Sequence, residues 1–227
     1  MRFDLTAGGR MWAVVLMSVL LVGMTVLFQP SPKDASNLIV SGKQRVHVIP
    51  STHLTKIDQK ERLRMRKMLE PAPAPQSDRF ERTVWIRDMQ QVIGRWISDD
   101  VEAGDVARWV YVYSRRFHIS PELVLAVIAV ESHFDRFAIS HAGARGLMQV
   151  MPFWKRQLGS SNDNLFEIET NVRYGCAILR TYLNRYGTTT RALAAYNGSL
   201  KNDSYPGLVY GQMKRFKASA QDLQNRG

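Results

Sequence analysis

The sequence predicts an all-α domain preceded by one N-terminal transmembrane helix. An uncharged apolar run occupies residues 11–28. From about residue 79 onward, apolar residues recur at intervals of three and four, which is the period of an amphipathic helix. No sustained alternation of apolar and polar residues, the period of a half-buried strand, accompanies them. The only strand structure that the sequence leaves open is a small β-hairpin near residues 137–147.

Residues 11–28 are long enough to cross a membrane. These 18 residues would rise ~27 Å as a helix, close to the thickness of a bilayer core. Arg2 and Arg10 precede the run, and basic residues stay on the cytoplasmic side, so the rest of the chain should face outward. A cleaved signal peptide is the alternative, but the run exceeds the usual ~7–15-residue signal core and no A-x-A site follows it. We expect residues 1–30 to form a cytoplasmic tip and an uncleaved anchor.

Residues 31–78 are typical of a basic juxtamembrane stalk. Residues 57–70 combine five Lys and Arg with Leu and Met and predict a helix. A charge run usually lies on a solvated face, so we expect this helix to be exposed, with contact to an anionic lipid or polymer as the alternative. The alternating prolines of residues 71–76 predict a stiff spacer. We place the domain boundary here, which leaves residues 79–227 as the folded domain.

The helices of this domain are predicted by apolar spacing and by end signals. Ser120 is a candidate N-cap, and Pro121 suits the first helical position. The helix of residues 121–131 is apolar almost all round, so it should be the buried centre of the domain. Gly187 should end a helix over residues 167–186. Further helices are expected near residues 85–96, 106–113, 152–159 and 188–197.

Composition narrows the class of protein. Lys and Arg number 31 against 20 Asp and Glu, a net charge of +11 that would attract any polyanion. No recognisable nucleic-acid motif is present, so we expect no nucleic-acid partner. Cys176 has no partner for an intrachain disulfide and should be a buried apolar residue. We expect no metal and no cofactor, since the five histidines show no ligand spacing: His47, His53, His118, His133 and His141.

Glu131 ends the most apolar helix of the domain. Desolvation there should raise the pKa of its carboxyl group and favour the neutral acid, which can donate a proton near neutral pH. Its position alone fits a solvated helix-end glutamate equally well. The following segment contains Gly143 and Gly146, which permit tight turns and close approach of a ligand. Gln149 adds hydrogen-bond donors and acceptors to an apolar stretch.

Four motifs carry a resemblance to a known family. They are Glu131-Ser132-His133-Phe134 followed by Ala138-Ile139-Ser140, then GARGLMQVMP at 143–152, then Ala195-Tyr196-Asn197, and finally Tyr205-x-x-x-Val209. In this order and spacing, the chain resembles the catalytic domain of the soluble-lytic-transglycosylase type, within the lysozyme-like superfamily. The resemblance covers residues 105 to 215.

The resemblance implies a lysozyme-like fold and a reaction on peptidoglycan. Family members cleave the bond between N-acetylmuramic acid and N-acetylglucosamine without added water. Glu131 would protonate the leaving oxygen and then act as base on the muramyl C6 hydroxyl, closing a 1,6-anhydro ring. Tyr205 would orient Glu131, and Tyr196 would support the site by packing. The remaining implied roles are sugar contacts by Gln149 and Asn197, an acetamido contact by Ser140 and a cleft wall at Met148.

Two departures from the family pattern leave one role open. Gly198 and Ser199 stand where the family has Ala-Gly, and Pro206 follows Tyr205 directly. Tyr210 is therefore a second candidate for orienting Glu131. A glycosidase usually has two carboxylates, and the nearest second acid is Asp135, to which the family pattern assigns no role.

Two alternatives of function remain beside the lytic reaction. A hydrolytic muramidase of the same fold would need a second acid to position water. A non-catalytic peptidoglycan-binding scaffold of an envelope-spanning secretion or conjugation machine would not need an active Glu131. In each case the expected location is the bacterial inner membrane, with a single span and the domain in the periplasm.

Overall fold

The computed structural model describes residues 58–70, 79–159, 161–200 and 202–225. The predicted anchor and the predicted spacer lie outside these residues. No helix among those described is long and apolar enough to cross a membrane. In chain order the helices are α1 (Gln59–Leu69), α2 (Arg79–Ile93), α3 (Asp100–Arg116), α4 (Pro121–Glu131), α5 (Phe153–Leu158), α6 (Ile168–Tyr186), α7 (Thr189–Tyr196) and α8 (Ser204–Gln224).

The all-α prediction is confirmed for the described residues. The hairpin that the sequence left open is reduced to two isolated antiparallel bridges, Ile139 with Arg145 and Arg145 with Val150. No named strand is present within the ranges given above. Turns hold residues 137–147 instead.

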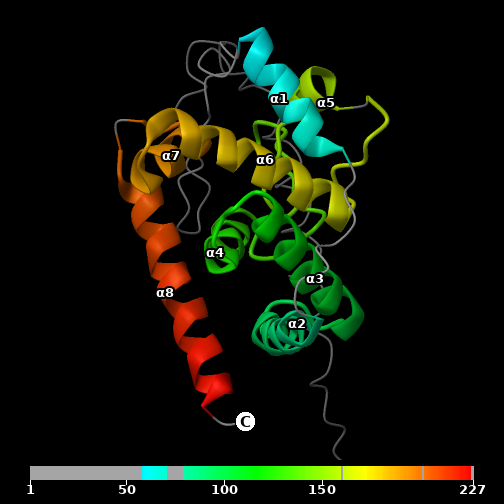
Figure 1. The fold of residues 1–227 in the computed structure, drawn as a ribbon, viewed down its shortest axis with the longest axis vertical. Coiled ribbons are helices and arrows are strands. Elements are labelled where there is room, and N and C mark those ends of the chain that lie inside the picture. Colours follow the sequence, from blue (N-terminus) through cyan, green and yellow to red (C-terminus); the bar gives the residue numbers. More distant parts are fainter. Residues whose placement is uncertain (1–57, 71–78, 160, 201, 226–227) are drawn as a thin grey trace, which may run out of the picture. The chain divides into compact units, whose positions relative to one another are not determined.

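Helix α4 is the buried centre of the domain, as its composition predicts. Every side chain from Leu123 to Ala129 is buried. α8 packs along one side of α4, and α3 packs on another (Figure 1). Ser120 precedes the helix, but its hydroxyl donates to the Glu122 carboxylate and does not cap the helix backbone. The start of α4 therefore depends on Pro121 and on burial of its side chains.

Helix α8 was absent from the sequence prediction. Pro206, Gly207 and Gly211 lower the helix propensity of its first turns. Proline is tolerated in the first turn of a helix, where its missing N–H would have no intrahelical acceptor. The helix is stabilised by packing on α4, through buried residues that include Val209 and Phe216. Tertiary contacts thus outweigh local propensity here.

The aromatic residue Trp96, expected on a helix face, lies beyond the end of α2. Its ring contacts Phe134, which follows α4, with a centroid distance of 5.1 Å. It also contacts Phe216 of α8, with a centroid distance of 5.6 Å. These three rings therefore join the segments after α2 and α4 to the middle of α8.

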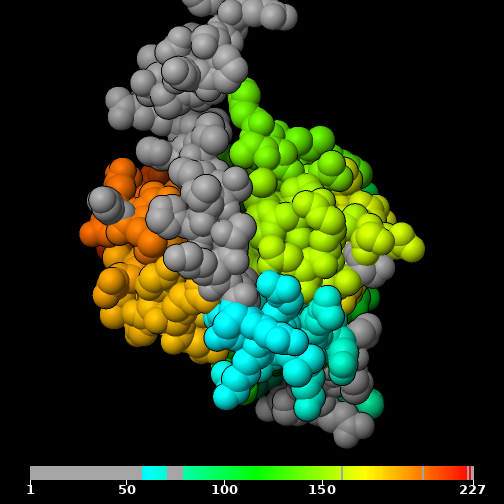
Figure 2. All heavy atoms as spheres, turned by 90° about the horizontal axis from the view of Figure 1, so that it is seen from above, coloured from blue at the N-terminus to red at the C-terminus, as the bar shows by residue number. Residues whose placement is uncertain are grey.

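Helix α1 packs on the domain and is not solvated all round. Met65 and Leu69 are 1% and 4% exposed and belong to the same core as α4. Arg173 of α6 donates from Nη1 to the Leu69 carbonyl at 2.6 Å. α1 contacts α5 and α6, and its other face, which carries the exposed Leu63, lies on the surface (Figure 2). The solvated interpretation holds for that outer face only.

Candidate active site

Glu131 meets Tyr205 at the point where α4 ends and α8 begins. The Tyr205 hydroxyl donates a hydrogen bond of 2.6 Å to Oε1 of Glu131. Burial raises the pKa of Glu131 from its ordinary value of 4.5 to about 7, and the hydrogen bond from Tyr205 opposes that rise. A carboxyl group with this pKa can both give and take a proton near neutral pH.

Tyr205 remains a donor in this arrangement. Burial, and then the nearby Glu131 carboxylate, raise the pKa of Tyr205 well above its ordinary value. The phenol therefore keeps its proton near neutral pH and can donate it to a hydrogen bond. The other candidate, Tyr210, pairs its hydroxyl with Thr190 at 3.0 Å. Of the two tyrosines, the structure places Tyr205 on Glu131.

The segment after α4 folds into tight turns beside this pair. The N–H of Gly143 donates to the Ser140 carbonyl, and the N–H of Ala144 donates to the Ser140 hydroxyl at 3.1 Å. Ser140 is thus the residue that closes the turn, and it stays partly exposed. Gly146 has a φ of +71°, and a Cβ there would lie 2.4 Å from Nδ2 of Asn171. Only glycine satisfies both conditions.

Gln149 uses half of its side-chain amide to hold this segment. Its nitrogen donates to the carbonyl oxygens of Gly146 at 2.9 Å and Ala138 at 3.2 Å. The backbone of Gln149 has a φ of +48°, an uncommon conformation for a residue with a Cβ. The amide oxygen is the part of this side chain that has no partner in the described residues. A sugar contact by Gln149 would therefore use Gln149 as an acceptor.

Met148 contributes to the site through its backbone. Its side chain is 0% exposed and packs on Gly175 of α6, where a Cβ would lie 2.3 Å from the sulfur. Its carbonyl accepts a hydrogen bond of 2.8 Å from the Tyr196 hydroxyl. The side chain predicted to wall the cleft is thus part of the core. Tyr196, predicted to support the site, ties the end of α7 to the segment that carries Gln149.

Asn197 follows Tyr196 as the C-cap of α7. Its backbone N–H donates to the Leu193 carbonyl, while its side chain is partly exposed and has no hydrogen bond to another described residue. The next residue, Gly198, has a φ of +75° and lets the chain leave the helix. The Gly-Ser pair after Asn197 therefore allows α7 to end at Tyr196.

Asn171 is a supporting residue that the sequence analysis did not single out. It lies on α6, is 1% exposed, and its Oδ1 accepts from the N–H of Met148 at 2.8 Å. Its Nδ2 donates to the carbonyls of Arg145 at 2.8 Å and Leu165 at 2.7 Å. A buried amide on the apolar face of a helix is unfavourable unless all its polar atoms are hydrogen-bonded. The asparagine among the apolar residues of this helix was therefore the sequence signal for a supporting residue.

The acidic residue nearest to Glu131 in sequence, Asp135, has a local role. Its Oδ1 accepts a hydrogen bond of 2.8 Å from the backbone N–H of Phe137, and the residue is exposed. No group of three or more His, Cys, Asp and Glu side chains that could hold a metal ion occurs among the described residues. The arrangement around Glu131 therefore presents one ionisable acid with one phenolic donor.

Comparison with known proteins bears on the same residues. Residues 110–208 match the family model described as the transglycosylase SLT domain. This part of the chain is a transglycosylase SLT domain. The SLT domain extends from within α3 to the first turn of α8, so it includes Glu131, Gln149, Asn197 and Tyr205.

Three relatives are similar to the SLT domain. The protein named transglycosylase of Enterobacteria phage PRD1 is 38% identical over 103 residues, 42% of this chain and 38% of the phage protein. Membrane-bound lytic murein transglycosylase F of Desulfosudis oleivorans is 39% identical over 83 residues, 34% of this chain and 18% of that protein. Membrane-bound lytic murein transglycosylase C of Edwardsiella ictaluri is 36% identical over 102 residues, 37% of this chain and 28% of that protein. The similarity thus spans well under half of each relative.

Proposed function

We propose that this protein is a lytic transglycosylase that cleaves the glycan strands of peptidoglycan, with Glu131 as the single acid and base. The observation that carries the proposal is the Glu131 carboxyl group, whose pKa burial raises to about 7 beside the Tyr205 donor. The SLT domain, and the names of the two murein transglycosylases to which it is similar, support the choice of substrate.

The proposed reaction needs two proton transfers, one from Glu131 and one to it. Neutral Glu131 protonates the oxygen that leaves when the bond between N-acetylmuramic acid and N-acetylglucosamine breaks. The resulting carboxylate, which accepts the hydrogen bond from Tyr205, then removes the proton of the muramyl C6 hydroxyl. That oxygen bonds to the anomeric carbon and closes the 1,6-anhydro ring. Glu131 is neutral again at the end, and no water is consumed.

The hydrolytic alternative requires a second carboxylate to activate water. The candidate for this role, Asp135, is exposed and closes a turn through the Phe137 N–H. The sugar contacts in the lytic scheme would come from the oxygen of Gln149, from Asn197 and from Ser140. All three are partly exposed, Ser140 and Gln149 on the segment that follows α4 and Asn197 at the end of α7.

The test is digestion of purified peptidoglycan sacculi by the full chain, with mass spectrometry of the released fragments. We expect fragments that end in 1,6-anhydro-muramic acid, which are lighter by one water than hydrolytic products. Glu131→Gln should lower the rate by about 10²–10⁴-fold, the usual contribution of a general acid. Reducing ends in the products would assign the protein to the muramidases. Full activity of the Glu131→Gln variant would overturn the proposal.

We also propose that residues 11–28 anchor the protein in the bacterial inner membrane with the SLT domain in the periplasm. Support comes from the apolar run and from the basic residues before it. Protease added to spheroplasts should degrade the domain, and protection from protease would contradict this topology.

An envelope-spanning secretion or conjugation assembly is the proposed partner, because a tethered enzyme acts locally. Crosslinking in intact envelopes that recovers no such component would count against it.

A further inference from the structure

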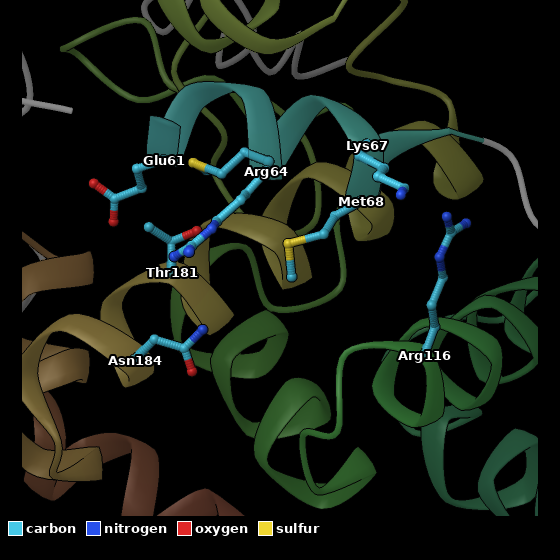
Figure 3. Close-up of a pocket in the computed structure, with 8 residues that line it drawn as sticks. Glu61, Arg64, Lys67, Met68, Arg116, Thr181 and Asn184 are labelled. Atoms are coloured by element: carbon cyan, nitrogen blue, oxygen red, sulfur yellow. The ribbon is translucent and has the colours of Figure 1, made fainter. Parts of the chain in front are cut away.

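A pocket of about 500 Å³ lies beneath α1, lined by side chains of α1, α3 and α6. Figure 3 shows α1 crossing above Thr181 and Asn184 of α6, with Arg116 of α3 reaching up toward the end of α1 that carries Lys67. None of the lining residues is among those that surround Glu131. The pocket is therefore separate from the proposed catalytic residues.

The lining carries an excess of positive charge. Arg64 and Lys67 come from α1, and Arg116 comes from the last turn of α3. The one acidic residue, Glu61, forms an ion pair with Arg185 and is thus already neutralised. Nη1 of Arg116 is shielded from solvent and has no hydrogen-bond acceptor within the described part of the chain. A buried donor without an acceptor is unfavourable, and an anionic oxygen in the pocket would supply one.

The lining also has an apolar part, beside the polar side chains of Thr181 and Asn184. Met65 and Met68 of α1 face the pocket, and methionine adapts readily to the shape of a flexible chain. The volume lies in the range of sites that bind small molecules, about 300–1,000 Å³. Cations beside an apolar surface match a ligand that has an anionic group on an apolar tail.

We propose that this pocket binds an anionic phospholipid. The phosphate would lie on Arg64, Lys67 and Arg116, and one acyl chain would lie on Met65 and Met68. The predicted anchor ends at residue 28 and α1 begins at Gln59, with 30 residues between them. A chain of that length spans at most about 100 Å, so headgroups of the membrane are within reach of α1. Lipid binding would hold the SLT domain close to the membrane.

The test uses the full chain in a neutral detergent, titrated with dihexanoyl-phosphatidylglycerol and followed by calorimetry. The triple variant Arg64→Gln, Lys67→Gln, Arg116→Gln should bind at least about tenfold more weakly. The matched control Lys214→Gln, Arg215→Gln, Lys217→Gln removes the same charge from exposed positions on α8 and should bind as the parent does. Should the triple variant fail to fold, Lys67→Glu against Lys214→Glu makes the same comparison at single exposed residues.

Three further titrations separate the sources of binding. Dihexanoyl-phosphatidylcholine should bind at least about tenfold more weakly than the anionic lipid, and equal binding would overturn the role of the cations. Inorganic phosphate that binds as tightly as the lipid would overturn the role of the methionines. A hexaglutamate peptide that binds in the same cation-dependent way while the lipid does not would assign the pocket to a protein partner. If both triple variants lost the same affinity for the anionic lipid, binding would depend on net charge alone, and the proposed site would be wrong.

Discussion

At the scale of single residues, the pKa of Glu131 determines both chemistry and stability. A carboxyl group that titrates near 7 in the folded protein and at 4.5 when unfolded binds its proton more tightly in the native state. The stability that this tighter proton binding gives the folded protein is fully present below pH 4.5 and is lost as the pH rises through 7. The cost at pH 8 is about 3 kcal/mol, because the native state must then hold a buried charge.

Glu131→Gln should therefore stabilise the protein by about 1–3 kcal/mol at pH 8 and by almost nothing at pH 4. Urea denaturation of the parent and the variant at both pH values measures this difference. The control is Asp100→Asn, at an exposed carboxylate in the first turn of α3, which should give no such gain at pH 8. A variant that gains as much at pH 4 as at pH 8 would show that the carboxyl group is not desolvated.

Tyr205 should be visible in the pH profile of the reaction. Its hydrogen bond favours the ionised form of Glu131, so Tyr205→Phe should raise the pKa of that carboxyl group further. We expect the alkaline limb of kcat/KM to move to higher pH by about half a unit or more, and kcat to fall by about tenfold. Tyr210→Phe, whose hydroxyl pairs with Thr190, should leave the profile unchanged. If the two variants gave identical profiles, Tyr205 would not be the orienting residue.

At the scale of elements, α6 supports the segment that carries Gln149. The side-chain amide of Asn171 accepts a hydrogen bond from the Met148 N–H and donates to the carbonyls of Arg145 and Leu165. Both the oxygen and the nitrogen of the amide are therefore paired. Gly146 is required beside it because a Cβ would overlap the Asn171 amide. The position of the predicted sugar-binding side chains thus depends on a helix that lies behind them.

Asn171→Leu should destabilise the protein by about 2–4 kcal/mol, because it leaves the Met148 N–H and the Leu165 carbonyl unpaired and removes one of two hydrogen bonds to the Arg145 carbonyl. The midpoint of urea denaturation measures the loss. Asn184→Leu, on the exposed face of the same helix, should change stability by less than about 0.5 kcal/mol. Activity of Asn171→Leu, assayed well below its melting temperature, should fall in kcat. Retention of both stability and kcat would contradict a supporting role.

At the scale of the whole molecule, α1 belongs to the hydrophobic core that the SLT domain shares. Met65 and Leu69 are buried against α5 and α6, and Arg173 holds the end of α1 through the Leu69 carbonyl. A chain that begins at residue 79 exposes the surface that these side chains cover. The family match begins later still, at residue 110, so the core extends beyond the part that defines the family.

A chain of residues 58–227 should therefore melt about 10 °C higher than one of residues 79–227, since two buried apolar side chains contribute about 4 kcal/mol. Calorimetry of the two proteins measures the difference. Met65→Ala in the longer chain should account for about half of it, and Leu63→Ala, at an exposed position of α1, for almost none. Equal melting temperatures would support residues 79–227 as the complete folding unit and contradict a stabilising role of α1.

Local patterns in the sequence predicted much of the fold. The helix periods and end signals located α4 to α7 within about two residues, but placed the starts of α2 and α3 about six residues too late. The apolar run of residues 121–131 predicted the buried α4. The same run left two possibilities for Glu131, a desolvated acid and a solvated glutamate at the helix end, and burial in the folded domain decides for the first. Helix α8 was missed since Pro206 and Gly207 carry the opposite local signal.

The sequence by itself determined an all-α domain, an apolar central helix that ends at Glu131, and four motifs that resemble the SLT family. Only the tertiary structure decided which tyrosine contacts that acid, which side of Gln149 remains for a ligand, and that Asn171 and α1 are part of the core. The physical reason is the sequence separation over which each interaction acts. Helix periods and caps act over about four residues, whereas Tyr205 and Glu131 lie 74 residues apart and meet only because α8 packs on α4.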